Sequence, residues 1–126
     1  MTSNQLGRVQ LLIMQVLWNQ ERATAREITD EINRSEPIAH STVQTLLRGL
    51  EDKGAAGHDV DGRTFTFFPL VAEQDFKQSA TRDLLHRVFG GSVESLVSHL
   101  LTNETIPDDE LAEIRKLIRR RSNKRG

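Results

Sequence analysis

The sequence predicts a mainly α-helical protein with a small β-hairpin wing, that is, a winged helix-turn-helix followed by further helices. Two short amphipathic helical patterns, separated by only a few residues, predict the helix-turn-helix. A segment rich in β-forming residues around an Asp-Gly pair follows directly and predicts the hairpin. Apolar stripes at helical spacing continue from residue 72 to the end. We therefore expect two regions, residues 1–71 and residues 72–126.

The first two helices are expected on either side of a polar turn. Apolar residues at helical spacing predict a helix over residues 6–18. Thr24 and Glu27 then match a capping box, in which the threonine hydroxyl accepts from the Glu27 N–H and the glutamate accepts from the Thr24 N–H. The second helix should end near Asn33, because Pro37 cannot continue a helix and biases the residue before it toward an extended conformation.

The next helix, expected over residues 38–54, has a polar outer face with few charges. Its inner face is apolar at i, i+3, i+4 and i+7, and the glycine at position 54 suits the C′ position. Charged side chains usually cover the solvent face of a helix, yet its first two turns hold none before Arg48. Short hydroxyl and amide side chains can approach base edges in DNA. The alternatives are a solvated amphipathic helix and, for Thr42, a hydroxyl bonded to its own helix.

The hairpin is expected from residue 55 to Pro69. Asp61-Gly62 favours a type I′ turn, whose two central positions both require positive φ. Arg63 would then lie at the tip, beside the backbone of any DNA in contact with the preceding helix; a polar hairpin residue without such a contact is the alternative. The candidate DNA-binding residues are His40, Ser41, Thr42, Gln44, Thr45, Arg48 and Arg63.

Three further helices are expected after residue 72, with Ser92 as an N-cap, Pro107 at the start of the last helix, and fraying over the last five residues. Their apolar faces are too extensive for one small core to cover, so a monomer would expose a large apolar surface. Pairing with a second copy would bury it and present two DNA-reading helices to a palindromic site. The candidate dimerisation residues are Val88, Phe89, Val93, Leu96, Val97, Leu100, Leu111, Ile114 and Ile118.

The charge of the chain argues against nucleic-acid binding. The 126 residues carry 17 basic and 18 acidic side chains, a net charge of −1. Residues 1–81 hold 8 basic and 11 acidic residues (net −3), and residues 82–126 hold 9 basic and 7 acidic residues (net +2). A DNA-binding half of net −3 must rely on how its charges are distributed. The main alternative is a winged-helix module that makes protein contacts without specific DNA binding.

Other classes of function have little support. Cysteine is absent, which excludes disulfides and thiolate metal sites and fits a reducing cytoplasm. No apolar run is long enough for a membrane span, and the polar start resembles no secretory signal. The four histidines lack ligand spacing and are expected at the surface, so we expect no metal, no cofactor and no enzyme. The basic residues 119–125 could touch DNA, although a charge cluster at a helix end is the default interpretation.

Five segments of the sequence resemble segments of a known protein family. They are LGRVQLLIMQVLW from residue 6, TAREI from residue 24, STVQTLLRGLEDKG from residue 41, GRTFTFFPLV from residue 62 and FGGSVESLV from residue 89. In this order they resemble the penicillinase (methicillin-resistance) repressor family of bacterial winged-helix regulators. The resemblance implies a homodimeric repressor with an N-terminal DNA-binding domain for a palindromic operator and a C-terminal dimerisation domain. It also implies induction by a membrane-bound sensor metalloprotease that triggers cleavage within the dimerisation region.

Two features depart from the family pattern. Well-known members are cut at an Asn-Phe bond in the C-terminal helices, where this chain has His99-Leu100. His99 and Leu100 are the candidate cleavage site, but we expect the known sensor proteases not to cut it, so a role in antibiotic resistance depends on this bond. Copper-responsive relatives carry a cysteine-rich metal motif, which excludes copper sensing by that route in a chain without cysteine.

Overall fold

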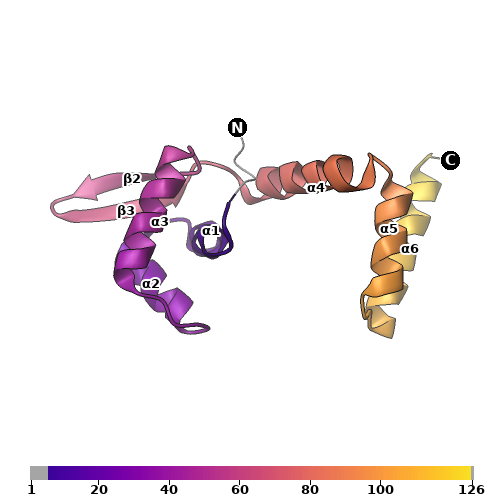
Figure 1. The fold of residues 1–126 in the computed structure, drawn as a ribbon, viewed down its shortest axis with the longest axis horizontal. Coiled ribbons are helices and arrows are strands. Elements are labelled where there is room, and N and C mark those ends of the chain that lie inside the picture. The colour runs from indigo at the N-terminus through magenta and orange to yellow at the C-terminus, as the bar shows by residue number, and fades with distance from the viewer. Residues whose placement is uncertain (1–5, 126) are drawn as a thin grey trace. The chain divides into compact units, whose positions relative to one another are not determined.

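The computed structural model describes residues 6–125 and confirms a mainly helical winged-helix architecture. The helices are α1 (Arg8–Gln20), α2 (Ala25–Asn33), α3 (His40–Asp52), α4 (Glu73–Phe89), α5 (Val93–Asn103) and α6 (Asp108–Arg125), and the strands are β1 (Ala23–Thr24), β2 (Ala56–Asp61) and β3 (Thr64–Pro69) (Figure 1). Residues 1–5, part of the segment where we predict no secretory signal, and Gly126 lie outside the described residues.

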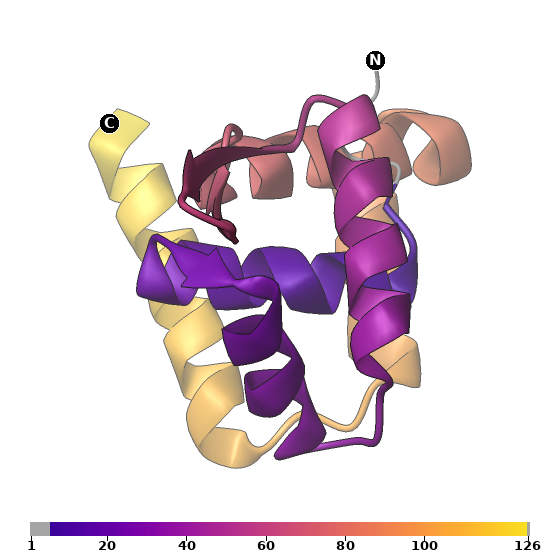
Figure 2. The ribbon, with the colours of Figure 1, turned by 90° about the vertical axis from the view of Figure 1, so that its left-hand side faces the viewer.

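The chain forms two compact units, Met1–Asp83 and Leu84–Gly126. The division falls inside α4, and the domain boundary predicted after residue 71 stays a prediction. The first unit has a core between its first three helices and the sheet. The fully buried large side chains are Ile13, Met14, Leu17, Ile28, Val43, Leu47 and Leu50. They come from α1, α2 and α3, so each of these helices turns an apolar face toward the core. Figure 2 shows how the ribbons of these three helices are arranged.

The turn between α2 and α3 is held by one amide side chain. Nδ2 of Asn33 donates to the carbonyl oxygens of Thr29 (2.9 Å) and Ile38 (3.0 Å), and its Oδ1 accepts from the Ile38 N–H (3.0 Å). Arg8 on α1 also donates two hydrogen bonds to the Glu36 carboxylate, and these bonds hold the pKa of that carboxyl below its usual range. The angle between the two helices is therefore fixed by side chains as well as by the core.

Helix boundaries follow the predicted caps. The Thr24 hydroxyl accepts from the Glu27 N–H (3.1 Å) and the Glu27 carboxylate accepts from the Thr24 N–H (2.8 Å), which confirms the capping box. At the end of α3, Gly54 has φ +78°, and its N–H bonds the Glu51 carbonyl. The Ala55 N–H bonds the Leu50 carbonyl, which completes a Schellman motif. The predicted C′ glycine is confirmed.

The wing differs from its prediction in two respects. Its sheet has three antiparallel strands in the order β1-β3-β2, because residues 23–24 pair with β3, a pairing too short to show as a strand pattern in the sequence. Asp61 pairs with Thr64, so the two loop residues are Gly62 and Arg63 instead of Asp61 and Gly62. Of these two only Gly62 has positive φ (+64°), as a type II′ turn requires at its first central position, so the predicted type I′ turn is wrong.

Trp18 on α1 contacts the start of α4, which belongs to the first unit. Its indole Nε1 donates to the Val71 carbonyl (2.8 Å), and its ring lies 5.5 Å from that of Phe76. Phe76 is buried, so the first turns of α4 complete the winged-helix core. The indole hydrogen bond fixes where the chain leaves the wing.

The second unit has no buried side chain of its own among the described residues. Gly90 and Gly91, both at positive φ, end α4, and Ser92 caps α5 by accepting from the Ser95 N–H (3.0 Å), as predicted. In Figure 2, α5 and α6 lie apart on either side of the loop that joins them. Residues 122–125 are helical, so the fraying predicted for them is wrong.

Replacing Asn33 with alanine should lower the free energy of unfolding by about 1–2 kcal/mol, because three hydrogen bonds from its side chain to the backbone of α2 and of the turn are lost. Denaturant unfolding measures this change. Asn19→Ala is the control, since Asn19 is exposed on α1 and its side chain has no hydrogen bond among the described residues. Equal unfolding midpoints for N33A and N19A would show that the hydrogen bonds of Asn33 contribute nothing to stability.

Candidate nucleic-acid interface

The outer face of α3 is open to solvent as the sequence predicts. Val43, Leu47 and Leu50 are fully buried on its inner face. The exposed candidates on its outer face are Ser41, Thr42, Gln44, Thr45 and Arg48. Because the buried residues lock the rotation of α3 about its axis, they also fix the direction of these polar side chains.

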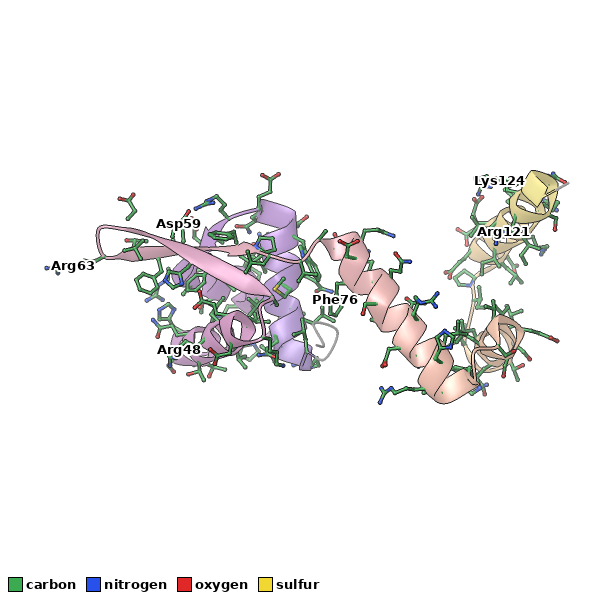
Figure 3. All side chains as sticks on the ribbon, turned by 90° about the horizontal axis from the view of Figure 1, so that it is seen from above. Arg48, Asp59, Arg63, Phe76, Arg121 and Lys124 are labelled. Atoms are coloured by element: carbon green, nitrogen blue, oxygen red, sulfur yellow. The ribbon has the colours of Figure 1, made fainter. Side chains whose placement is uncertain are left out.

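An open groove of about 630 Å³ runs between α3, the start of α2 and the wing. Its lining residues are Thr24, Ala25, Arg26, His40, Gln44, Arg48, Glu51, His58, Arg63, Thr64, Phe65 and Phe67. The structure thus brings four predicted residues, His40, Gln44, Arg48 and Arg63, to one surface. Arg63 lies at the wing tip and points away from the hairpin, while Arg48 lies on α3 (Figure 3).

Three arginines give the groove a positive charge. Arg26, Arg48 and Arg63 are exposed and have no hydrogen-bond or ion-pair partner among the described residues. The one acidic residue in the lining, Glu51, is bonded to Nδ1 of His58. Elsewhere in this unit Arg8 pairs with an acidic side chain, as do Arg22 and Arg34. Free positive charge is therefore concentrated in the groove although residues 1–81 have a net charge of −3.

The ring of His40 is held at the start of α3 by a hydrogen bond to α2. The Thr29 hydroxyl donates to the Ala25 carbonyl (2.7 Å), so its oxygen is left to accept from Nδ1 of His40 (3.2 Å). Nε2 of His40 is then left for an external partner: it accepts from a base amino group when the imidazole is neutral and donates to a phosphate oxygen when the imidazole is protonated.

The wing is held from both of its faces. On the face toward the groove, the His58 ring stacks on Phe65 with centroids 4.2 Å apart and bonds Glu51 at the end of α3. On the other face, Arg22 pairs with Asp59 and lies 5.1 Å from the Phe68 ring centroid. These contacts link β2 and β3 to α3 and to the residue before β1, so they set the position of the tip.

Several of these residues were not predicted from the sequence. His58 was expected as a surface histidine, yet it is half-buried and bonded to Glu51, so that expectation is wrong. Arg22, Glu51 and Phe65 carry no sequence signal, because their roles depend on cross-strand pairing. Arg26 could have been found, since it follows a capping threonine at the start of α2, the helix before α3.

The candidate dimerisation residues lie in α4, α5 and α6. The exposed ones are Val88, Val93, Val97, Leu100 and Ile118, and the half-buried ones are Phe89, Leu96, Leu111 and Ile114. The candidate cleavage bond His99-Leu100 lies inside α5. In the described residues no cluster of three or more His, Asp or Glu side chains could hold a metal ion. No helix in this part of the chain is long and apolar enough to cross a membrane.

Helix α3 has a buried inner face and a free polar outer face, and it lies beside a hairpin with an arginine at its tip. This arrangement is typical of winged helix-turn-helix proteins that bind DNA. The sequence model of the penicillinase repressor family matches residues 6–120. The chain therefore belongs to the penicillinase repressor family, a family of DNA-binding transcriptional repressors, as its sequence motifs predict.

Individual relatives agree with this assignment. The penicillinase repressor of Bacillus licheniformis is 26% identical over 121 residues, which cover 96% of this chain and 94% of that protein. The methicillin resistance regulatory protein MecI of Staphylococcus aureus (strain N315) is 28% identical over 109 residues, 86% of this chain and 89% of that protein. The solution structure of the DNA binding domain of the repressor BlaI matches with TM-score 0.53 and 30% identity, covering 59% of this chain and 90% of that one.

Asp59→Asn should loosen the wing, because it removes the partner of Arg22. An exposed ion pair contributes up to about 1 kcal/mol, so amide exchange at the tip should become roughly 2–5-fold faster. Asp61→Asn removes the same charge from the same strand, but Asp61 has no side-chain partner among the described residues, so exchange there should not change. If both variants accelerate amide exchange equally, the ion pair between Arg22 and Asp59 does not hold the wing in place.

Proposed function

We propose that this chain is a homodimeric transcriptional repressor that binds a palindromic operator in cytoplasmic DNA through the groove between α3 and the wing. The observation that carries the proposal is that three unpaired guanidinium groups line one groove beside the exposed polar face of α3. Arginine binds phosphate oxygens or guanine edges, and short polar side chains reach bases. Phosphate contacts would position the wing and the start of α2, and α3 would read the sequence.

The second unit supports the dimer part of this proposal. None of its described side chains is buried, although Val93, Val97 and Leu101 line an open, mostly apolar groove of about 520 Å³ on α5. A helical unit without a core is not stable by itself, because helix propensity alone does not offset the loss of conformational entropy. A second copy would supply the missing core. The dimer would then join two weak half-site contacts into one strong one.

A winged-helix module for protein contacts is the alternative function. The net charge of −3 over residues 1–81 favours it, since such a domain attracts undirected DNA weakly. Binding of the full chain to a duplex from upstream of its own gene, compared with a scrambled duplex of equal length, separates the two functions. Preference for the upstream duplex in fluorescence anisotropy supports the repressor. Equal and weak binding to both supports the module.

Thr45→Ala and Arg48→Ala should each weaken operator binding by about 1–3 kcal/mol if the side chain makes a good base contact. Arg63→Ala should instead weaken operator and scrambled duplexes alike and lower the salt slope by about 1, because a wing-tip arginine would contact phosphate. Anisotropy titrations at several salt concentrations measure both effects. Wild-type affinity in both T45A and R48A would show that another face of α3 reads DNA.

Sedimentation of the wild-type chain at micromolar concentration should give twice the chain mass of 14.3 kDa. The double variant V93D/V97D should sediment as a monomer, because it places two charges on the apolar face of α5. The control S95D/H99D adds two acidic side chains to residues of α5 that do not line this groove and should stay dimeric. A dimeric V93D/V97D would place the interface elsewhere.

We further propose that repression ends when the dimer is lost. A cut at His99-Leu100 would divide α5, separate its last turn and α6 from the rest of the chain, and destroy the interface. A membrane sensor metalloprotease, as the family resemblance implies, would be the antirepressor partner. The bond lies within a helix and lacks the Asn-Phe pair, so cleavage there needs both local unfolding and a different specificity.

In β-lactam-treated cells that contain a family sensor protease, the repressor should therefore remain full length on a blot. The variant H99N/L100F restores the Asn-Phe pair at the same helical position and should be cut. A wild-type fragment ending near residue 99 would show that the His-Leu bond is a substrate. An uncut H99N/L100F chain would show that the identity of this bond is not what decides cleavage.

A further inference from the structure

The last three turns of α6 carry many positive charges, and none of these residues belongs to the groove beside α3. After Glu113 the chain has no acidic residue. The basic residues that follow are Arg115, Lys116, Arg119, Arg120, Arg121, Lys124 and Arg125. Those up to Lys124 are exposed, and Figure 3 shows Arg121 and Lys124 toward the C-terminal end of the helix.

Part of this charge is gathered on one side of the helix, which we call the α6 basic face: Lys116, Arg119 and Arg120. These residues stand at i, i+3 and i+4 and line a shallow hollow of about 460 Å³ together with Glu113 and Asn123. Lys116 donates to Glu113 (3.1 Å). Arg119 and Arg120 have no partner in the described part of the chain, so two guanidinium groups are free to bind an external anion.

The helix dipole does not account for the α6 basic face. The favourable effect of the dipole on cations is confined to the last turn of a helix. Helix α6 ends at Arg125, so Lys116 and Arg119 lie more than one turn before its end. A cluster that extends so far into the helix, with Glu113 as the one acidic side chain bonded to it, keeps a net positive charge that a bound polyanion would offset.

The proposed dimer interface would leave this face free. At about 100° per residue, Lys116 lies roughly 160° around the helix from Ile114 and Ile118, and Arg119 and Arg120 lie roughly 100–160° from them. The apolar stripe of α6 and its basic face are therefore on different sides of the helix. Burial of the stripe against a second copy would leave Arg119 and Arg120 in solvent.

We propose that the α6 basic face is a second DNA-contacting surface, which binds backbone phosphates without regard to base sequence. This inference rests on the proposed repressor function. The unit that reads DNA has a net charge of −3 over residues 1–81, whereas residues 82–126 have a net charge of +2, so the second unit supplies the general attraction that the first lacks. Arginine's planar donors suit phosphate oxygens, and no geometry for base reading is needed.

The test compares the salt dependence of DNA binding by three full-length double variants. R119Q/R120Q removes the two free charges, R119K/R120K keeps them, and K77Q/R82Q, the control, removes two exposed charges from α4, of which Lys77 is paired with Glu73. Each is titrated with the operator duplex and with a scrambled duplex, after sedimentation and circular dichroism have shown an intact folded dimer. Should the double variant not fold, the single variants R119Q and R120Q replace it.

We expect R119Q/R120Q to weaken binding to both duplexes and to make the slope of log K against log salt less steep by about 1–4, from up to four lost contacts in a dimer at about 0.9 each. R119K/R120K should bind as the wild type does, and K77Q/R82Q should change the slope less. A wild-type slope in R119Q/R120Q overturns the inference. So does an equal change in K77Q/R82Q.

An anionic membrane is the competing polyanion, and vesicles of phosphatidylserine and phosphatidylcholine test it with the same variants. Loss of vesicle binding in R119Q/R120Q with unchanged DNA binding overturns the inference. The proposed function can fail separately. If the wild type does not prefer operator over scrambled DNA, yet R119Q/R120Q still flattens the slope on scrambled DNA, the repressor proposal fails and the α6 surface stands.

Discussion

Burial of the inner face of α3 against α1 is the constraint on which the rest of the first unit depends. Val43, Leu47 and Leu50 are fully buried, and each contributes about 1.5–3 kcal/mol by leaving water. Their sum is comparable to the whole net stability of a typical small domain, about 5–15 kcal/mol. Rotation of α3 about its axis would forfeit that energy, so the direction of its polar outer face is fixed. The hydrogen bonds of Asn33 to the turn before α3 and the Schellman motif after it then fix the two ends of this helix.

Local arrangement of charge matters more here than the net charge. In physiological salt, charges interact over about one Debye length, roughly 8–10 Å, so distant acidic residues hardly affect the groove. Within residues 1–81 the arginines outside the groove are paired with carboxylates, and the acid inside it is bonded to His58. The three free guanidinium groups therefore dominate the potential at the surface beside α3. A similar separation holds on α6, where the acidic first turn and the basic last turns leave one end strongly positive.

Most elements of the fold could be predicted because their signals are local. The capping box at Thr24, the C′ glycine at Gly54 and the N-cap at Ser92 depend on residues within one turn of each other, and the structure confirms all three. The hairpin turn was misplaced by one residue. Its register is set by pairing along the whole of β2 and β3, and Asp-Gly is compatible with either placement. The short strand β1 gives no signal at all, since two residues have no period.

The sequence by itself determined the family, through its motifs, and the polar outer face of α3, because apolar periodicity decides which side of a helix is buried. Only the tertiary structure decided how the site is assembled. Arg26, Arg48 and Arg63 come from three different elements, and nothing in their sequence spacing indicates that they share a groove. Likewise His58 became a partner of Glu51 only because β2 packs beside the end of α3. Contacts between residues far apart in the chain depend on the packing of whole elements, which local patterns do not encode.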